Sequence, residues 1–413
     1  MRRKGLWGEP DFLKLWGGQA VSHLGSTITD VGLPLTAIMI LKASPFQMGL
    51  LSGVGAVVVL VFGLFAGAWA DRLRRRPILI SADLGRAAIL GTVPLAAALG
   101  RLSIAQLYLV AASASLLTTL FEVSYQAYLP SLVERENLVE CNSKLALAQS
   151  AGDVGGPGLT GLLVQWITAP MAILFDAVSF LVSALSIASI RKPEPPPGHS
   201  AHGNLGREIV EGMRASWHDP ILRALVLRTA TAAFCLGSFA ALYMVFGIRE
   251  LGLSAGLLGA IISVGGASSL AGAFVAPRLV SRFGLGRTMI GAAVVTGVTT
   301  LLPALSRGPV ALAAAVLGTA QLFDLAWPIY HINEITLRQA VTPDHLLGRV
   351  NSAMHLLFRG LVPAGALVAG AIAEVIGIRY TLLSGALCYL LSTLWLIFSP
   401  IRHLQKIPEV RKT

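Results

Sequence analysis

Long apolar segments recur along the whole of this chain of 413 residues, and they limit its possible folds more than any other feature. A helix needs about 20 apolar residues to cross the hydrocarbon core of a bilayer. Hydrophobic residues make up 54% of the chain and charged residues only 13%, whereas soluble domains carry about 25% charged residues. The chain has too few charges to coat a soluble core of this size, so a polytopic membrane protein is predicted.

Hydropathy predicts twelve membrane crossings, and each is expected to be an α-helix. In lipid, every backbone N–H and C=O group must be satisfied within its own segment, and a β-barrel would show short alternating segments instead. The predicted fold class is therefore an all-α membrane protein with twelve transmembrane helices. The expected crossings are 16–40, 47–70, 77–99, 104–128, 140–167, 170–190, 221–247, 254–277, 287–306, 309–334, 349–374 and 378–399.

The distribution of Lys and Arg predicts that both termini are cytoplasmic. One side of the expected helices holds most of the 32 basic residues, among them Arg86, Arg228 and Arg338. Cytoplasmic loops of membrane proteins are enriched in Lys and Arg, so this richer side is assigned to the cytoplasm. The net charge of +11 is then a topology signal, and nucleic-acid binding is not expected because the basic residues form no continuous stripe. The opposite side holds Lys42, Arg101, Arg249, Arg307 and Arg379.

One long polar connection divides the chain into two halves. It opens with Arg191-Lys-Pro-Glu-Pro-Pro-Pro-Gly, which cannot be helical. Leu205, Ile209, Met213 and Trp217 then recur at helical spacing and predict an amphipathic helix on the cytoplasmic face. The expected domains are an N-terminal six-helix bundle (1–190), this linker (191–219), a C-terminal six-helix bundle (220–400) and a cytoplasmic tail (401–413).

The two halves resemble each other in sequence, which indicates an internal repeat. Near their starts, Gly49-Leu-Leu-Ser parallels Gly256-Leu-Leu-Gly at an offset of 207. Parallel repeats imply a pseudo-twofold axis along the membrane normal and a substrate site between the halves, near mid-membrane. An offset of 209 aligns Asn142 with Asn351, Gly156 with Gly365, Gly161 with Gly370, and Ala177 with Ala386.

The loop between the second and third expected helices reads Gly67-Ala-Trp-Ala-Asp71-Arg72-Leu-Arg74-Arg75-Arg76. It resembles the G-x-x-x-D-R-x-G-R-R signature of the major facilitator superfamily, with Arg74 in place of the second glycine. The resemblance implies a transporter that works by rocking one half against the other. It also implies a conformational latch formed by Gly67, Asp71, Arg72, Arg75 and Arg76, although the arginines would equally serve as a positive-inside anchor.

The fifth expected helix contains Gly152-Asp-Val-Gly-Gly156-Pro157-Gly158-Leu-Thr-Gly161. This run is similar to the antiporter signature G-x-x-x-G-P-x-x-G-G, with Thr160 in place of one glycine. Pro157 kinks the helix and the glycines let a neighbour approach, and ordinary small-residue packing is the alternative reading. Runs around Trp16, Leu129–Leu138 and Gly348–Ser352 resemble the bacterial twelve-helix exporters related to macrolide-efflux proteins and the enterobactin exporter.

Polar residues form stripes on the helices that line the cavity in this family. A buried ionisable residue costs about 2.5–3.5 kcal/mol on insertion scales, so each one needs a reason. We expect proton exchange at one or two of Asp30, Glu122 and Asp324, and ring stacking of Tyr125 and Trp327 on a flat or cationic cargo. The stripes are Gln19, His23, Ser26 and Asp30 on helix 1, Thr118, Glu122 and Tyr125 on helix 4, and Asp324, Trp327, His331 and Glu334 on helix 10.

Several charged and polar residues of the expected helices also have an alternative, purely structural interpretation. His23 and His331 are either proton carriers or polar packing residues. Glu334 is expected in water at the cytoplasmic mouth, and Asp83 and Arg86 are expected to form a structural pair. Packing or interhelical bonding is the expected role of Asp153, Asp176, Arg359 and Glu374.

These features favour a secondary active transporter of the bacterial cytoplasmic membrane that exports small lipophilic or cationic molecules by proton antiport. No phosphate-binding loop of the G-x-x-x-x-G-K-[ST] kind occurs, so ATP is not the expected drive. The partners are the substrate, protons and the lipid bilayer, and the chain is expected to be a monomer. Dedicated metabolite or siderophore export, and nutrient symport, remain alternatives.

A membrane-embedded enzyme is the alternative from a different class, and no nucleophile–base or metal motif supports it. No cofactor and no metal are expected. Cys141, Cys235 and Cys388 lie far apart in sequence and are expected to form neither a disulfide framework nor a metal site.

Overall fold

The structure of the chain, a computed structural model, describes residues 8–72, 74–134, 137–194 and 205–408. Within these ranges, the side chains of residues 60, 63–72, 139, 205–209 and 344 are not described. Helix accounts for 88% of the structure, and the described ranges contain no strand. The predicted all-α class is therefore confirmed.

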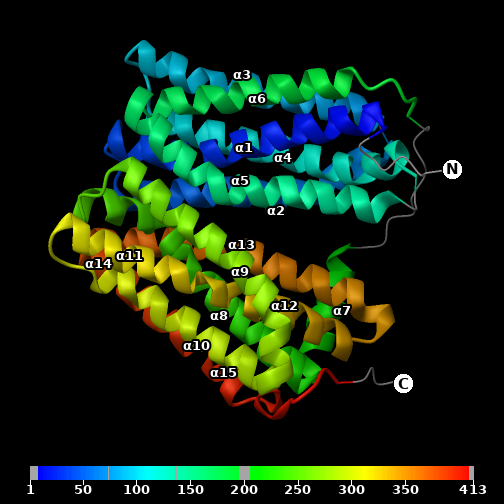
Figure 1. The fold of residues 1–413 in the computed structure, drawn as a ribbon, viewed down its shortest axis with the longest axis vertical. Helices are drawn as coiled ribbons and strands as arrows, with labels where there is room; N and C mark the ends of the chain where they lie inside the picture. Colours follow the sequence, from blue (N-terminus) through cyan, green and yellow to red (C-terminus); the bar gives the residue numbers. More distant parts are fainter. Residues whose placement is uncertain (1–7, 73, 135–136, 195–204, 409–413) are drawn as a thin grey trace. The chain divides into compact units, whose positions relative to one another are not determined.

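Helices α1 to α6 belong to the first half of the chain (Figure 1). They are α1 (Pro10–Met39), α2 (Pro45–Arg72), α3 (Arg75–Ala98), α4 (Ile104–Leu132), α5 (Leu138–Ile167) and α6 (Ala169–Ala188). The second half contains α7 (Leu205–His218), α8 (Pro220–Val245), η3 (Phe246–Glu250), α9 (Ala255–Phe283), α10 (Leu285–Leu305), α11 (Val310–Leu322), η4 (Phe323–Leu325), α12 (Ala326–Val341), α13 (Asp344–Ile376), α14 (Ile378–Leu391), α15 (Leu394–Ile397) and η5 (Pro400–His403).

Nine helical segments within the described ranges are long and apolar enough to cross a membrane. Each of the nine overlaps one of the expected crossings, and α11, η4 and α12 together form one of them, Val310–Val341. Helices α1 and α5 have the length but contain more polar residues. The full number of twelve crossings and the cytoplasmic position of both termini stay predictions.

The chain divides into two compact units, and each contains a piece of a helix from the other half of the sequence. Unit 1 comprises residues 1–43, 54–200 and 254–263, and unit 2 comprises residues 44–53, 201–253 and 264–413. The first turns of α9 therefore belong to unit 1, and the first turns of α2 belong to unit 2. The boundaries expected from the sequence, 1–190 and 220–400, contain no such exchange.

Both units pack their helices in the same order. In unit 1, neighbouring helices follow the order α4, α3, α6, α1 and α5. In unit 2, the order is α12, α10, α14, α8 and α13. Each helix of the second series is the repeat counterpart of the helix in the same place in the first, so the sequence repeat corresponds to a repeated packing arrangement.

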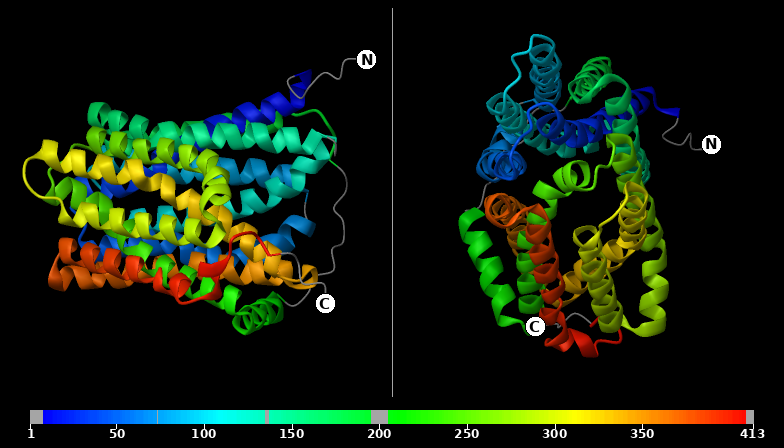
Figure 2. Two further views of the ribbon diagram at one scale, coloured as in Figure 1. Left: turned by 60° about the horizontal axis from the view of Figure 1, so that its bottom comes forward. Right: turned by 90° about the vertical axis from the view of Figure 1, so that its left-hand side faces the viewer.

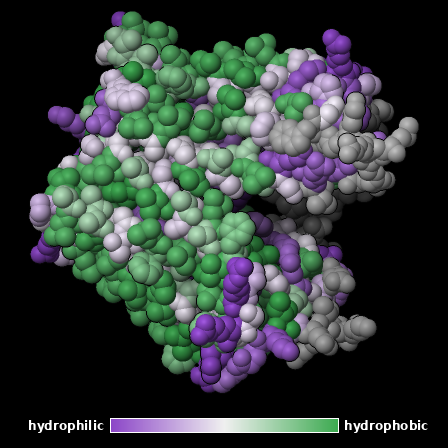
Figure 3. All heavy atoms as spheres, in the orientation of Figure 1, coloured by the Kyte–Doolittle hydropathy of each residue, from purple (hydrophilic) through white to green (hydrophobic). Residues whose placement is uncertain are grey.

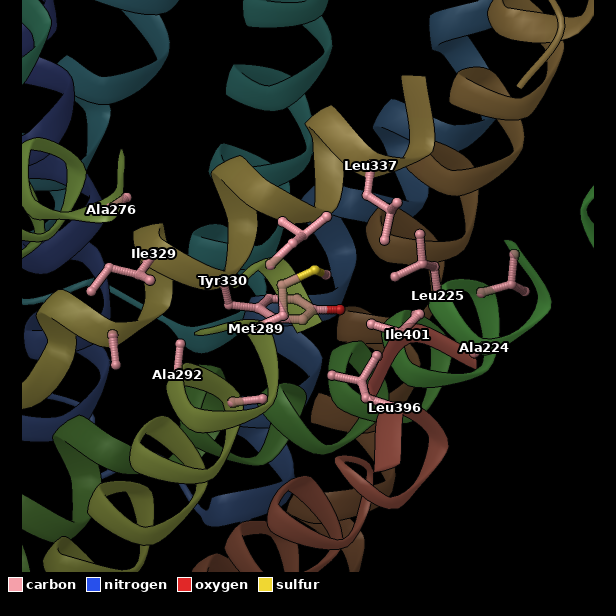
Figure 4. Close-up of a cluster of buried hydrophobic side chains, with 14 of the residues drawn as sticks. Ala224, Leu225, Ala276, Met289, Ala292, Ile329, Tyr330, Leu337, Leu396 and Ile401 are labelled. Carbon is pink, nitrogen blue, oxygen red and sulfur yellow. The ribbon is translucent and has the colours of Figure 1, made fainter. Parts of the chain in front are cut away.

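Each unit has its own apolar core. One apolar cluster of unit 2 gathers residues of α8, α10 and α12 with Leu396 and Ile401, and Figure 4 shows Met289, Leu337 and Tyr330 within it. A corresponding cluster in unit 1 includes Phe12, Leu79 and Tyr128. Large apolar side chains also cover the outside: Phe274 is 75% exposed and Val375 is 84% exposed. On the face drawn in Figure 3, hydrophobic residues cover the helix flanks and hydrophilic residues gather near helix ends, as contact with lipid requires.

The predicted amphipathic linker helix is present as α7, within unit 2 (Figure 2). Glu211 forms an ion pair with Arg349 at the start of α13, with 2.8 Å between Oε2 and Nη1. Gly212 lies directly against the Arg349 carbonyl, where a Cβ would clash. Val210 and Trp217, on the other face, are 65% and 52% exposed. The ion pair and the close contact therefore fix α7 to α13, and the exposed face of α7 carries the apolar side chains of Val210 and Trp217.

Charged residues at one end of unit 1 satisfy the free backbone groups of helix termini. The first N–H groups and the last C=O groups of a helix have no partner within it. The Glu194 carboxylate accepts hydrogen bonds from the backbone N–H groups of Arg75 (2.6 Å) and Arg76 (3.1 Å) at the start of α3. The Arg76 guanidinium donates to the carbonyl of Ala188 at the end of α6 (2.6 Å). Glu194 therefore caps α3 from a distant segment.

Asp11 and Lys14 form a second group of such contacts at this end. Lys14 donates to the Ser189 carbonyl (2.8 Å), and Asp11 accepts from the N–H groups of Arg191 and Lys192. The hydrogen bond from Lys14, together with these N–H groups, holds the pKa of Asp11 below its ordinary value. A lowered pKa in the folded state stabilises the fold above the unfolded pKa, and that contribution is lost as pH falls through the folded pKa.

We predict that Glu194→Ala lowers the stability of the purified protein by about 1 kcal/mol, because two N–H groups of α3 lose a charged acceptor. The measurement is the midpoint of thermal unfolding in detergent. Glu134→Ala, which removes an exposed carboxylate just past the end of α4, is the matched control and should leave the midpoint unchanged. Equal midpoints for both variants would show that Glu194 does not cap α3.

Candidate functional site

The polar stripe predicted on α1 divides between two neighbouring helices. The Gln19 amide donates to the Ser183 hydroxyl of α6 (3.0 Å), so this side chain serves helix packing. His23 points to α5, where its Nε2 lies 2.9 Å from Oδ1 of Asp153. Asp30, two turns further along α1, is exposed. The sequence placed all of these residues on one face correctly, but it did not show which neighbour each side chain reaches.

Asp153 forms an interhelical bond, which the sequence analysis named together with packing as its expected role. Its side chain is nevertheless 64% exposed, and it pairs with a histidine that is 32% exposed. The signal that could have identified it is its place beside Gly152. A Cβ on Gly152 would lie 2.7 Å from Cδ2 of His23, so the glycine leaves room for the imidazole ring.

The remaining residues of the helix 5 motif have contacts on two sides of α5. A Cβ on Gly156 would lie 2.5 Å from Cγ2 of Thr27, so this glycine permits close contact with α1. On the other side, Gly161 lies against the Ala255 carbonyl and the Pro157 carbonyl lies against Gly259. The N–H of Gly158 donates to the Ser263 hydroxyl (2.8 Å). These α9 residues belong to unit 1, so the motif holds the first turns of α9 to α5.

Unit 2 repeats this contact with α13 and the start of α2. Gly49 lies against the Ala366 carbonyl, and Gly370 lies against the Pro45 carbonyl. Gly49 therefore has the place of Gly259, and Pro45 has the place of Ala255, at an offset of 210. The offset of 207 that the sequence suggested for this segment is wrong, because the Gly-Leu-Leu similarity there does not follow the helix contacts.

On α4, the two candidate side chains differ in their surroundings. Glu122 is exposed, as expected for a residue that meets water or cargo. Tyr125 is half-buried and stacks on Phe121, with ring centroids 5.8 Å apart and planes 15° apart. Part of its ring therefore belongs to the core of unit 1.

Arg86 is buried inside unit 1, although the sequence analysis had counted it among the basic residues of the cytoplasmic side. Its guanidinium carbon lies 4.5 Å from the ring centroid of Phe121 and 4.0 Å from that of Phe180. Its ion pair with Asp83 is present, as predicted. Asp176 is buried nearby on α6 and accepts hydrogen bonds from Thr29 and Ser179, which is the predicted interhelical bonding.

A second buried arginine, Arg228, contacts the equivalent pair of aromatic rings in unit 2. Arg228 is 3% exposed, and its guanidinium carbon lies 4.8 Å from the ring centroids of both Tyr330 and Tyr389. Tyr330 and Tyr389 are the counterparts of Phe121 and Phe180 at the offset of 209. The repeat thus keeps the aromatic pair but supplies the cation from α3 in one unit and from α8 in the other.

The tenth expected helix is interrupted at Asp324. Pro328 has no N–H to donate to the carbonyl of Asp324, and a 3₁₀ turn, η4, replaces the α-helix at this point. The Asp324 carboxylate accepts a hydrogen bond from Ser269 on α9 (3.2 Å). The Gln321 amide one turn earlier donates to the Tyr243 hydroxyl of α8 (3.4 Å). Three elements of unit 2 therefore place a polar group at the helix break.

Beyond the break, the stripe on α12 separates into an exposed part and a buried part. Trp327 is 40% exposed and stacks on His331, with ring centroids 4.8 Å apart. Glu334 is only 4% exposed and pairs with Arg338, which is 7% exposed, at 3.0 Å. The expectation of Glu334 in water is wrong, because the pair lies inside the helix bundle of unit 2.

The latch motif is described only in part. The side chains of Gly67, Asp71 and Arg72 lie outside the described residues. Arg75 and Arg76 donate backbone N–H groups to Glu194, and Arg76 also bonds the end of α6. The described part of the motif therefore fixes helix ends within unit 1.

Two of the cysteines come close together in the structure. Cys235 on α8 and Cys388 on α14 are 153 positions apart in sequence, yet their side chains are neighbours, and both thiols are free. Gly385 makes this possible, because it lies against α8 at Ser238 and Cys235. No group of three or more metal-ligating side chains is found among the described residues.

The helical architecture, the repeated packing and the apolar flanks define a multi-span membrane transporter of the major facilitator type. The profile of the transmembrane secretion effector family, a branch of that superfamily, matches residues 8–411, and the chain belongs to this family.

Curated relatives cover nearly the whole chain. The chain is 27% identical to the multidrug efflux pump Tap of Mycolicibacterium fortuitum, over 91% of this chain and 92% of that protein. It is 24% identical to macrolide efflux protein A of Streptococcus pyogenes, over 95% of this chain and 97% of that protein. The resemblance to macrolide-efflux exporters expected from the sequence is thereby confirmed.

Solved structures share the fold. The nucleoside transporter NupG matches with a TM-score of 0.79 and 12% identity, over 94% of this chain and 99% of that chain. A bacterial homologue of the iron transporter ferroportin, in an inward-facing state, matches with a TM-score of 0.74 and 19% identity, over 94% of this chain and 98% of that chain. At these identities the likeness concerns the fold alone.

We predict that Gly156→Ala reduces both the yield of folded protein and its thermal stability, because the added methyl group forces α1 and α5 apart. The matched control is Gly155→Ala on the same helix, where no atom lies within 4 Å of the added Cβ. It should behave like the original chain. Fluorescence-detected size-exclusion chromatography with a heating step reads both effects, and equal behaviour of the two variants would contradict the close contact.

We predict that Arg338→Met destabilises the protein by about 3–5 kcal/mol, because Glu334 is left buried without its partner. The double variant Arg338→Met with Glu334→Gln should recover most of the loss, since no uncompensated charge remains. Unfolding midpoints of the two single variants and the double variant form the cycle that measures the coupling. Additive losses would mean that the pair does not interact.

Proposed function

We propose that this protein exports small organic molecules, lipophilic or cationic, across the bacterial cytoplasmic membrane in exchange for protons. It spans the membrane with twelve helices in two six-helix bundles, residues 1–190 and 220–400, with both termini in the cytoplasm. A monomer carries out transport by alternating access.

The observation that carries the proposal is the exposure of Asp30 and Glu122 on helices of membrane length. Both carboxylates lie well inside α1 and α4, more than two turns from either helix end. A carboxylate facing lipid is costly, so an exposed acid at this depth is best explained by a water-filled path. A path lined by acids suits a cationic cargo and a proton, which then compete for the same groups.

Aromatic and polar groups of unit 2 supply further contacts for such a cargo. Trp327 is exposed and already stacked on His331, so its ring is held in one orientation. A flat or cationic molecule gains stacking and cation–π energy on a ring of this kind. Asp324, at the helix break beside Ser269, is the acid of this unit that we assign to proton exchange.

Export is favoured by the relatives, which are named as a multidrug efflux pump and a macrolide efflux protein. Proton coupling follows from the carboxylates rather than from those names. The buried Glu334 and the packed Gln19 are structural, so the proposal assigns no transport step to them.

The proposal predicts that proteoliposomes containing the protein accumulate tetraphenylphosphonium, a lipophilic cation, when a proton gradient of opposite direction is imposed. A protonophore should abolish the accumulation. Asp30→Asn, Glu122→Gln and Asp324→Asn, made singly, should each be compared with Glu134→Gln, an exposed acid outside the helices. We expect one or two of the three variants to lose gradient-driven accumulation and the control to retain it.

Undiminished, gradient-driven accumulation in all three variants would exclude these acids as proton carriers. Accumulation that is indifferent to the protonophore in the original protein would exclude proton coupling altogether. Turnover of the probe without a gradient would instead indicate an enzyme.

A further inference from the structure

We propose that the His23–Asp153 pair in unit 1 carries one of the exchanged protons, and that a cationic cargo releases this proton by taking the place of protonated His23 beside Asp153. This inference rests on the proposed function and adds to it a residue, Asp153, that the polar stripes did not include. It also assigns a purpose to Gly152 of the helix 5 motif.

The geometry around His23 suits the protonated ring. One ring nitrogen, Nε2, lies 2.9 Å from the Asp153 carboxylate. A neutral imidazole has one N–H and one bare nitrogen, whereas a protonated ring donates from both. The carboxylate is an acceptor, so Nε2 carries a hydrogen, and protonation of the second ring nitrogen turns this hydrogen bond into an ion pair.

Exposure makes the pair able to exchange. The His23 side chain is 32% exposed and the Asp153 side chain is 64% exposed, although both lie on long helices of unit 1. By contrast, the pairs Asp83–Arg86 and Glu334–Arg338 have exposed fractions of 8% or less on every partner. Those two pairs are fixed within the helix bundles, while the His23–Asp153 pair is open to water and to a ligand.

Comparison of the two repeats shows that the His23–Asp153 pair is not part of the helix packing that both units share. At the offset of 209, Asp153 corresponds to Val362, and α8, the counterpart of α1, contains no histidine. Gly156 keeps its counterpart, Gly365, because both permit close helix contact. Gly152 has Leu361 as its counterpart, so a glycine is present only in the unit where a histidine ring must fit. The packing is repeated in both units, and the proton-binding pair occurs in one.

The other charged groups around α1 are accounted for. Asp30, on α1 itself, interacts electrostatically with His23 and is exposed. Asp176, on α6, is buried and bonded to Thr29 and Ser179. Glu122, on α4, is exposed and interacts with the buried Arg86. Asp153 is therefore the carboxylate in direct contact with His23, and Asp30 is a second acid that a cation leaving or entering the pair would meet.

The exchange balances in charge and in protons. In the resting pair, protonated His23 donates to the Asp153 carboxylate. A cationic cargo that reaches Asp153 forms an ion pair with the carboxylate. The protonated His23 ring then releases one N–H proton to water. His23 is then neutral, Asp153 remains ionised, and one positive charge has replaced another. Reprotonation of His23 from the opposite side of the membrane reverses the step and releases the cargo.

The test measures protons released when the purified protein binds tetraphenylphosphonium, in weakly buffered detergent solution with a pH-sensitive dye. Cargo binding is measured in parallel by equilibrium dialysis. We expect the original protein to release protons on binding. Asp153→Asn and His23→Gln should lose the release, while His345→Gln, the same change at an exposed histidine at the start of α13, should retain it. Release at the original level in both pair variants would overturn the inference.

His23→Lys keeps a cation beside Asp153 but replaces the titrating group, and it guards against loss of folding. We expect this variant to keep the original unfolding midpoint, to bind the probe more weakly and to release no protons. Proton release from a folded His23→Lys variant would overturn the inference. If the original protein itself released no protons and transport ignored the proton gradient, the proposed function would have failed, and this inference would fail with it.

Discussion

The cost of placing a charge where water is absent governs the arrangement of this protein. A chain with so few charged residues keeps several of them within helices of membrane length, and each has a partner or an exposed position. Arg86 lies between two aromatic rings with Asp83 beside it, and Glu334 is joined to Arg338. Both of these ion pairs are thereby neutralised within their units, whereas Asp30, Glu122 and the His23–Asp153 pair are exposed, and these are the groups to which we propose a function.

Close contact between helices is the second requirement of this fold. Glycine permits such contact at corresponding places in both units. Gly161 and Gly259 join α5 to the first turns of α9, and Gly370 and Gly49 join α13 to the first turns of α2. Interhelical contacts of this kind depend on van der Waals packing, because lipid offers no hydrophobic drive for helix association. The antiporter-like motif therefore has a structural role in α5, to which Gly152 adds space for a titratable ring.

Family membership and geometry support different parts of the functional account. The transmembrane secretion effector family and the efflux relatives indicate a transporter that exports. Neither of them indicates which groups exchange protons. The assignment that we propose rests on exposure and pairing: Asp153 is exposed and bonded to His23, whereas Glu334, on a predicted cavity helix, is enclosed and bonded to Arg338. Position on a cavity helix was a weaker guide than the partner of each side chain.

The sequence by itself determined the helical class, the places of the nine apolar spans, the amphipathic linker helix and the repeat, because these depend on hydropathy and spacing along the chain. Tertiary structure alone decided which side chains meet. Cys235 and Cys388 lie close together although they are far apart in sequence, Arg228 and Arg338 are buried although the sequence counted them with the basic residues of the cytoplasmic side, and Asp153 pairs with His23. The physical reason is that a side chain's free energy depends on the neighbouring helix it faces, and helical spacing fixes the face but not the neighbour.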